Sequence, residues 1–120
     1  MLTREFVVAF AEDWVKAWND RDLAAVVDHY ADDVTFHSPR IRAVTGQDID
    51  RVVGKEALRA YWHAALERAP ELHFEIERVL LGSDCCTILY RNHRRESVAE
   101  TFVFSGGSVV EAIACSAPTD

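Results

Sequence analysis

One acidic residue near the C-terminus, Glu100, stands in an otherwise apolar β-prone run. Alternate positions of a strand share one face, so Glu100 is expected on the same face as Val98, Phe102 and Phe104. A carboxylate on such a face must be paired, be hydrogen-bonded or have a raised pKa, and a raised pKa suits a general acid or base. The alternative is a structural ion pair with Arg91 from the adjacent strand.

A second titratable candidate, His37, follows a short β-prone run that Pro39 ends, because proline has no backbone N–H for a ladder. The alternation places His37 on the opposite face of the run from Phe36. A strand end of this kind can carry a side chain to a pocket rim, where histidine can act as a base near neutral pH. We predict His37 and Glu100 as catalytic residues, able to form an acid–base pair across a pocket. The alternative for His37 is an exposed histidine at the rim.

Aromatic side chains on the predicted helices can line a cavity, since buried indole N–H and phenol O–H groups need hydrogen-bond partners and often contact ligands. In this hypothesis Trp14 and Tyr61 donate hydrogen bonds to an oxyanion that develops on the ligand. The alternative role is core packing. The predicted ligand-binding residues are Trp14, Tyr30, Phe36, Tyr61, Trp62, Arg91 and Phe102.

The remaining histidines and the cysteines show no pattern typical of a metal site. His29, His63, His73 and His93 are scattered, and no cysteine lies at zinc-ligand spacing from a histidine. The chain also lacks a glycine-rich phosphate-binding loop. The sequence therefore predicts no metal site and no cofactor.

Length and charge restrict the class of protein. A chain of 120 residues is expected to form one domain, over residues 1–120, with a single core. A net charge of −7 argues against nucleic acid and against anionic membranes as partners. No apolar run approaches the length of a membrane span, and the N-terminus lacks a signal-peptide pattern. Three cysteines make a disulfide framework improbable, which favours the cytoplasm.

Hydrophobic periodicity predicts three helices followed by strands. The i, i+3, i+4 recurrence of apolar residues indicates helices over 3–19, from 22 to Tyr30, and over 54–70. A short strand over 34–37 separates the second helix from a long loop over 40–53, which can act as a lid. From residue 72 the period is two, and strands are expected over 72–81, 85–92, 97–104 and 109–116.

This order predicts an α+β fold in which three N-terminal helices pack on one face of a curved, mostly antiparallel sheet. It resembles the nuclear transport factor 2-like superfamily, which has a cystatin-like fold and includes ketosteroid isomerases and SnoaL-like polyketide cyclases. The matching segments are WVKAWNDRDL at 14–23, YADDVTF at 30–36, GKEAL at 54–58 and ETFVF at 100–104. The resemblance implies a cone with an internal pocket, onto which the superfamily has grafted many functions. It also implies a homodimer formed through the outer face of the sheet.

The roles of a ketosteroid isomerase can be compared with this chain position by position. The resemblance places Ser38 at the position of the aspartate base and Trp14 at that of the oxyanion tyrosine, while Glu100 retains the acidic partner. Two of the three roles are changed. Steroid isomerisation is therefore not expected.

The leading hypothesis is a SnoaL-like pocket protein that binds an apolar or aromatic small molecule. It would catalyse a cofactor-free proton transfer, such as an isomerisation, cyclisation or hydration, through His37 or Glu100. The second hypothesis is a non-catalytic ligand-binding or dimeric interaction module. The third is an epoxide hydrolase-like enzyme with an Asp-Arg-Asp arrangement, in which Asp48 or Asp50 joins Arg91 and Glu100.

Overall fold

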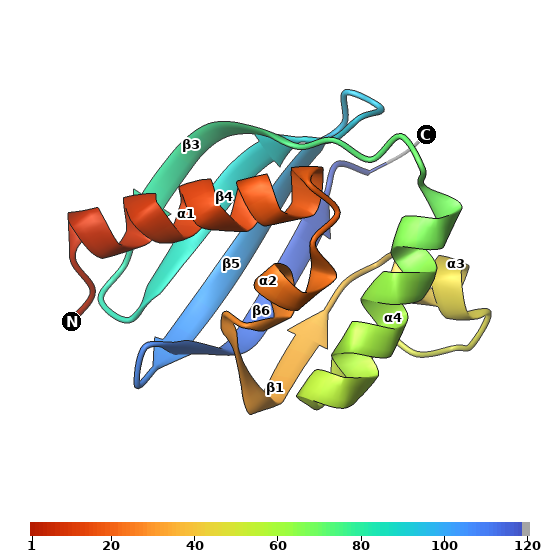
Figure 1. The fold of residues 1–120 in the computed structure, drawn as a ribbon, viewed down its shortest axis with the longest axis horizontal. Coiled ribbons are helices and arrows are strands. Elements are labelled where there is room, and N and C mark those ends of the chain that lie inside the picture. The colour runs from red at the N-terminus through yellow and green to blue at the C-terminus, as the bar shows by residue number, and fades with distance from the viewer. Residues whose placement is uncertain (119–120) are drawn as a thin grey trace.

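The computed structural model describes residues 1–118 as a helical layer on a six-stranded sheet (Figure 1). The elements in chain order are α1 (Arg4–Asn19), α2 (Leu23–Val27), β1 (Tyr30–His37), α3 (Ile41–Thr45), β2 (Arg51–Val53), α4 (Lys55–Arg68), β3 (Glu75–Leu81), β4 (Cys85–Arg91), β5 (Ser97–Ser105) and β6 (Ser108–Ser116). The predicted α+β fold is confirmed.

The sheet has the strand order β2-β1-β6-β5-β4-β3. All neighbouring strands are antiparallel except β1 and β6, which are parallel. Figure 1 shows α1 and α2 lying over one face of the sheet, while α4 lies over its β1 end beside α3. The curved, mostly antiparallel sheet was predicted, and the parallel pair of strands makes it a mixed one.

Side-chain caps define the starts of the first two helices. Thr3 Oγ1 accepts a hydrogen bond from the backbone N–H of Phe6 at 3.1 Å, and Asp22 Oδ1 accepts one from that of Ala25 at 3.2 Å. Each bond satisfies one of the N–H groups that have no partner inside the helix. The predicted first helix over 3–19 is therefore confirmed.

Two sequence-based predictions for the segment after α1 were wrong. The second helix ends at Val27, and Tyr30 is the first residue of β1, where it pairs with Val109 of β6. The stretch over 40–53 is not a plain loop, because it contains α3 and β2. Gly46, with a φ of 71°, ends α3, and β2 adds a short antiparallel strand to β1. Elements of three to five residues are too short to show a hydrophobic period.

The core lies between the helices and the inner face of the sheet. On the α1 side, the rings of Phe10 and Trp14 meet Phe102 with centroid distances of 5.0 and 5.3 Å. On the α4 side, Trp62 contacts Phe36 with a centroid distance of 5.5 Å. A cavity lies beside these two aromatic groups, and Trp14, Phe36 and Trp62 line it. Within residues 1–118, no helix has the length and apolar character needed to cross a membrane.

Candidate functional site

A cavity of about 380 Å³ opens between α1, α3, α4 and the inner face of the sheet. This volume lies in the range of small-molecule sites, which are concave, mostly apolar and carry a few polar groups. The lining residues are Trp14, Trp18, Phe36, Ser38, Arg40, Ala43, Val44, Tyr61, Trp62, Ala65, Arg68, Ala69, Glu71, Leu72, Phe74, Tyr90, Asn92, His93, Arg94, Val98, Glu100, Ala114 and Ser116.

Glu100 lies in the buried part of this cavity, with 4% of its surface exposed. Its register partners on β4 and β6 are Ile88 and Ala114, so the carboxyl group is flanked by apolar side chains. Its Oε1 accepts a hydrogen bond from the Tyr90 hydroxyl at 3.1 Å. Burial raises the pKa of Glu100 to about 7, and the hydrogen bond from Tyr90 partly opposes this rise.

Tyr90, the partner of Glu100, is held by aromatic packing. Its ring lies 4.6 Å from that of Phe74 and 5.4 Å from that of Trp14, centroid to centroid. Burial also raises the pKa of Tyr90 well above its ordinary value, so its hydroxyl stays protonated and acts as a donor. The pair therefore combines a permanent donor with a carboxyl group that can change charge near neutral pH.

Aromatic side chains from two helices and β1 form the apolar wall. Trp14, Phe36, Tyr61 and Trp62 line the cavity as the sequence analysis predicted. Burial raises the pKa of Tyr61 to about 12, which keeps its hydroxyl a donor. The Trp14 indole N–H is already engaged, because Nε1 donates to the Tyr30 hydroxyl at 3.1 Å. The predicted oxyanion role of Trp14 is therefore not supported, whereas that of Tyr61, whose hydroxyl group belongs to a lining residue, stays a prediction.

The family model of the SnoaL-like domain matches residues 11–113. The chain belongs to the SnoaL-like family. A crystal structure of a SnoaL-like protein of unknown function from Burkholderia thailandensis superposes with a TM-score of 0.90 at 39% identity, over 98% of this chain and 100% of that one. AclR, a putative hydroxylase from Streptomyces galilaeus, superposes with a TM-score of 0.75 at 18% identity, over 96% and 91% of the two chains. No curated protein matches the chain.

The fold of this SnoaL-like protein is also that of a cystatin-like structure from Methylobium petroleophilum. The two superpose with a TM-score of 0.78 at 16% identity, over 99% of this chain and 80% of that one. The predicted superfamily and the cystatin-like, nuclear transport factor 2-like fold are therefore confirmed. At identities below a quarter, such neighbours establish the fold alone.

Two predicted site residues of the SnoaL-like protein lie on the outer face of the sheet. His37 Nε2 lies 3.0 Å from Glu111 Oε2, and Arg91 donates to Glu77 Oε2 at 3.0 Å. Neither residue lines the cavity, so neither an acid–base pair between His37 and Glu100 nor an ion pair between Arg91 and Glu100 is formed. Strand alternation explains both corrections, because Phe36 and Tyr90 point inward and their neighbours must point outward.

Tyr30 and Phe102 are buried behind the lining residues and do not themselves line the cavity. They hold its wall in place, Tyr30 through the Trp14 indole and Phe102 through ring contacts with Phe10 and Trp14. The structure therefore does not support their predicted role as ligand contacts, because neither side chain lines the cavity.

The arrangement expected of an epoxide hydrolase is not present. Asp48 pairs with Arg42 at 3.0 Å and Asp50 pairs with Arg51 at 3.2 Å, and both carboxylates are mostly exposed. Arg91 lies on the outer face of the sheet, so it does not contact Glu100. Asp48 and Asp50 do not supply the second carboxylate that this arrangement requires. The described residues also contain no group of three side chains placed to bind a metal ion.

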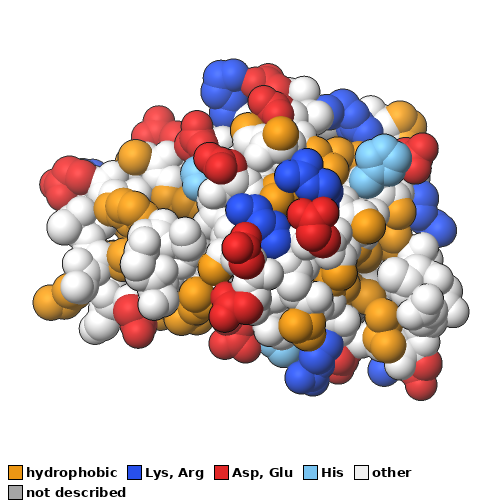
Figure 2. Space-filling view, turned by 60° about the horizontal axis from the view of Figure 1, so that its bottom comes forward, with side chains coloured by type: hydrophobic (Ala, Val, Ile, Leu, Met, Phe, Trp, Pro, Cys, Tyr) orange, Lys and Arg blue, Asp and Glu red, His pale blue; other side chains and the backbone are white. Residues whose placement is uncertain are grey.

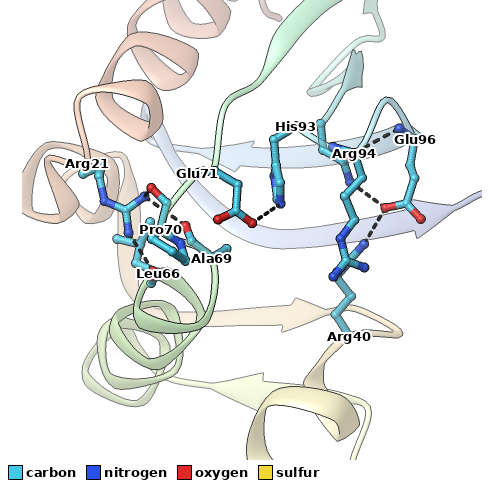
Figure 3. A network of polar contacts seen from close by, with 10 residues as sticks. Arg21, Arg40, Leu66, Ala69, Pro70, Glu71, His93, Arg94 and Glu96 are labelled. Carbon is cyan, nitrogen blue, oxygen red and sulfur yellow. Dashed lines mark hydrogen bonds and ion pairs between the residues drawn. The ribbon is translucent and has the colours of Figure 1, made fainter.

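The mouth of the cavity holds polar residues that the sequence analysis missed. Figure 3 shows Arg40 reaching Glu96, at 2.9 Å, and His93 facing Glu71, at 3.5 Å. Nearby, Arg21 donates to three backbone carbonyl oxygens at the C-terminal end of α4, at 2.6 to 3.3 Å. These contacts fix α4 and the β4–β5 turn on opposite sides of the opening. Since they join segments far apart in the chain, no local pattern could have indicated them.

Tyr90 was also missed, although a signal for it exists. Tyr90 alternates with Cys86 and Ile88 along β4, so all three side chains lie on the inner face of the sheet. β4 also pairs with β5, the strand that carries Glu100. A tyrosine on an apolar face beside a buried carboxylate is the natural hydrogen-bond donor for that carboxylate.

Two further polar atoms of lining residues, Trp18 Nε1 and His93 Nδ1, are buried without a hydrogen-bond partner in the part of the chain described here.

Proposed function

We propose that this SnoaL-like protein binds an apolar or aromatic small molecule in its cavity and that Glu100 transfers a proton between two atoms of that molecule, without a cofactor. The observation that carries the proposal is the Glu100–Tyr90 pair, buried in a cavity with aromatic walls. A carboxyl group with a pKa of about 7 populates both its protonated and its ionised form near neutral pH. It can therefore both accept and return a proton during one turnover.

The steps follow from the side chains that line the cavity. The ionised carboxyl group of Glu100 takes a proton from a carbon next to a ligand carbonyl, leaving an enolate. The Tyr61 hydroxyl, which remains protonated, is placed in the same cavity to donate to the enolate oxygen. In an isomerisation, the protonated Glu100 then returns the proton to a carbon conjugated with the enolate, so that the double bond shifts. In a cyclisation, the enolate carbon first forms a bond to a second carbonyl carbon of the ligand, whose C=O π bond opens to an alkoxide, and Glu100 returns the proton to that alkoxide oxygen.

An experiment with 2-tetralone, a bicyclic aromatic ketone with acidic C–H bonds, tests this proposal. Proton exchange of the ketone in deuterated water is followed by NMR with the wild-type protein and with Glu100→Gln (E100Q). We expect E100Q to lower the catalysed exchange about 100-fold, the usual contribution of one general base, while 2-tetralone still binds. Glu75→Gln, an exposed carboxylate on β3, is the matched control and should leave the exchange unchanged.

A bulky side chain next to Glu100 tests whether the exchange takes place inside the cavity. Ala114 lines the cavity directly opposite Glu100 in the register of β5 and β6, so Ala114→Leu should exclude the ketone and abolish both binding and exchange. Equal exchange by E100Q and the wild-type protein would contradict proton transfer by Glu100.

A second candidate function is binding without chemistry. The observation that favours it is that, among residues 1–118, Glu100 is the one carboxylate in the buried part of the cavity, whereas Glu71 lies exposed at the mouth beside His93. A protein that bound 2-tetralone and did not accelerate its exchange would support this candidate over the first.

A homodimer formed through the outer face of the sheet is a further part of the proposal. This face carries partly exposed apolar side chains, among them Leu80 and Ile113, which are 46% and 37% exposed. We expect Ile113→Arg to convert a dimer to a monomer in sedimentation velocity. Ile49→Arg is the matched control, because Ile49 is 38% exposed and lies off the sheet. A monomeric wild-type protein would contradict this part of the proposal.

We also propose a cytoplasmic location, which the state of the cysteines supports. Cys85, Cys86 and Cys115 are free thiols, and Cys115 is exposed. An exposed thiol is liable to oxidation outside a reducing compartment. Thiol labelling of the protein in intact cells would test the location.

A further inference from the structure

Three arginine side chains, Arg40, Arg68 and Arg94, line the cavity near its opening. They come from the start of α3, the last turn of α4 and the β4–β5 turn, so the fold places side chains from distant parts of the chain around one cavity. The protein as a whole has a net charge of −7, and acidic side chains are spread over the face seen in Figure 2, with basic ones between them. A group of arginines at one opening of an acidic protein therefore creates a local field that attracts anions.

The three arginines differ in what they already bind. Arg40 is paired with Glu96, which also accepts from the Asn92 side chain, so Arg40 serves the structure of the mouth. Within residues 1–118, neither Arg68 nor Arg94 makes an ion pair, and both side chains are exposed at the opening. The two rim carboxylates named above are already engaged, Glu71 with His93 and Glu96 with Arg40. Two guanidinium groups at the mouth are thus free to bind an anion.

We infer that the natural ligand is an aromatic carboxylic acid, bound with its ring system in the cavity beside Glu100 and its carboxylate at the mouth between Arg68 and Arg94. This inference rests on the proposed function, because it names the class of molecule that the same cavity takes. The reverse orientation would place the ligand carboxylate beside Glu100 and the apolar lining residues Val98 and Ala114. There it would lose its hydration and lie next to a second carboxyl group.

The anion is a carboxylate and not a phosphate ester, for a structural reason. Phosphate sites commonly use several backbone N–H groups from a glycine-rich turn or a helix N-terminus. None of the five glycines of the chain lines this cavity, and α4 contributes its C-terminal end to the mouth. Guanidinium groups, by contrast, bind a planar carboxylate through paired N–H donors.

Calorimetric titration with a matched pair of probes tests this inference. The probes are 2-naphthoate and its neutral analogue 2-naphthamide, which has nearly the same shape. We expect the wild-type protein to bind the acid about twentyfold more tightly than the amide at low salt, with the difference shrinking at high salt because exposed charges are screened. The double variant Arg68→Gln/Arg94→Gln should bind both probes equally and should bind the amide as the wild-type protein does.

The control is Arg59→Gln, which removes the same charge from α4 at an exposed position outside the cavity. This variant should keep the preference for the acid. Equal binding of acid and amide by the wild-type protein, or an equal loss in Arg59→Gln, would overturn the inference and leave the proposed pocket intact. Tighter binding of 2-naphthyl phosphate than of 2-naphthoate would overturn the choice of a carboxylate. Binding of none of the probes would overturn both the inference and the proposed pocket.

Discussion

Glu100→Gln is expected to stabilise the folded protein at alkaline pH, and to stabilise it progressively less as the pH falls. The pKa of Glu100 is about 7 in the folded protein and close to its ordinary value of 4.5 in the unfolded chain. Between these two values the folded state holds a proton that the unfolded state has lost, so the free energy of unfolding of the wild-type protein decreases as the pH rises through this window. Converted at 1.36 kcal/mol per pH unit, the loss amounts to about 3 kcal/mol once the pH exceeds the folded pKa.

The variant carries a neutral amide of the same shape, which can still accept the hydrogen bond from Tyr90 and has no charge to bury. The difference in the free energy of unfolding between E100Q and the wild-type protein should therefore grow by about 3 kcal/mol from about pH 4.5 to about pH 8.5. Urea unfolding at a series of pH values measures it. Glu75→Gln, which makes the same substitution at an exposed position of β3, is the matched control.

A second variant at the same site separates the effect of burial on the pKa of Glu100 from the effect of its hydrogen bond with Tyr90. The Tyr90 hydroxyl lowers the pKa of Glu100 from the value that burial alone would give. Tyr90→Phe should therefore move the pH window of the stability loss upward. Parallel stability curves for E100Q and the wild-type protein would show that Glu100 ionises normally in the fold, and would remove the physical basis for its proposed catalytic role.

The long periodic elements could be predicted from the sequence because their hydrophobic pattern repeats several times. The helices over Arg4–Asn19 and Lys55–Arg68 and the strands β4 and β5 each contain enough turns or alternations to fix both their type and their inward face. The same alternation placed Glu100 on the inner face with the buried Phe102. These features depend on local pattern alone. In β3 the register with β4 shifts between Ile76 and Arg78, so Leu80 lies on the outer face although its alternation with Ile76 would place it inside.

The remaining features depend on contacts between distant segments. The parallel pairing of β1 with β6, the short strand β2 and the polar mouth arise from tertiary packing, which no window of the sequence contains. The prediction for His37 failed for a different reason. The alternation along β1 correctly places His37 on the face opposite Phe36. Because Phe36 packs inward, the same rule places His37 outside the pocket. Strand alternation alone therefore predicts the outer position that His37 occupies, whereas its position at a pocket rim was implied by the family resemblance.

Trp62→Ala is expected to destabilise the folded protein by about 4 kcal/mol, because removing a large buried aromatic side chain leaves a void that its neighbours fill only in part. Trp62 is 4% exposed, and its ring lies 5.2, 5.0 and 5.5 Å from those of Trp18, Tyr30 and Phe36. It therefore ties α4 to α1 and β1 at the wall of the cavity. Urea unfolding gives the change in the free energy of unfolding.

Two matched variants serve as controls for Trp62→Ala. Trp62→Phe retains an aromatic ring and should cost no more than about 2 kcal/mol, whereas Phe6→Ala removes a ring that is 38% exposed and should cost less than Trp62→Ala. A loss below about 1 kcal/mol for Trp62→Ala would mean that the wall can collapse onto the space the indole leaves. The cavity would then not be held open by its aromatic frame, and a ligand would have to open it. The expected large loss instead requires a rigid wall, which presents Glu100 to a ligand in a preformed site.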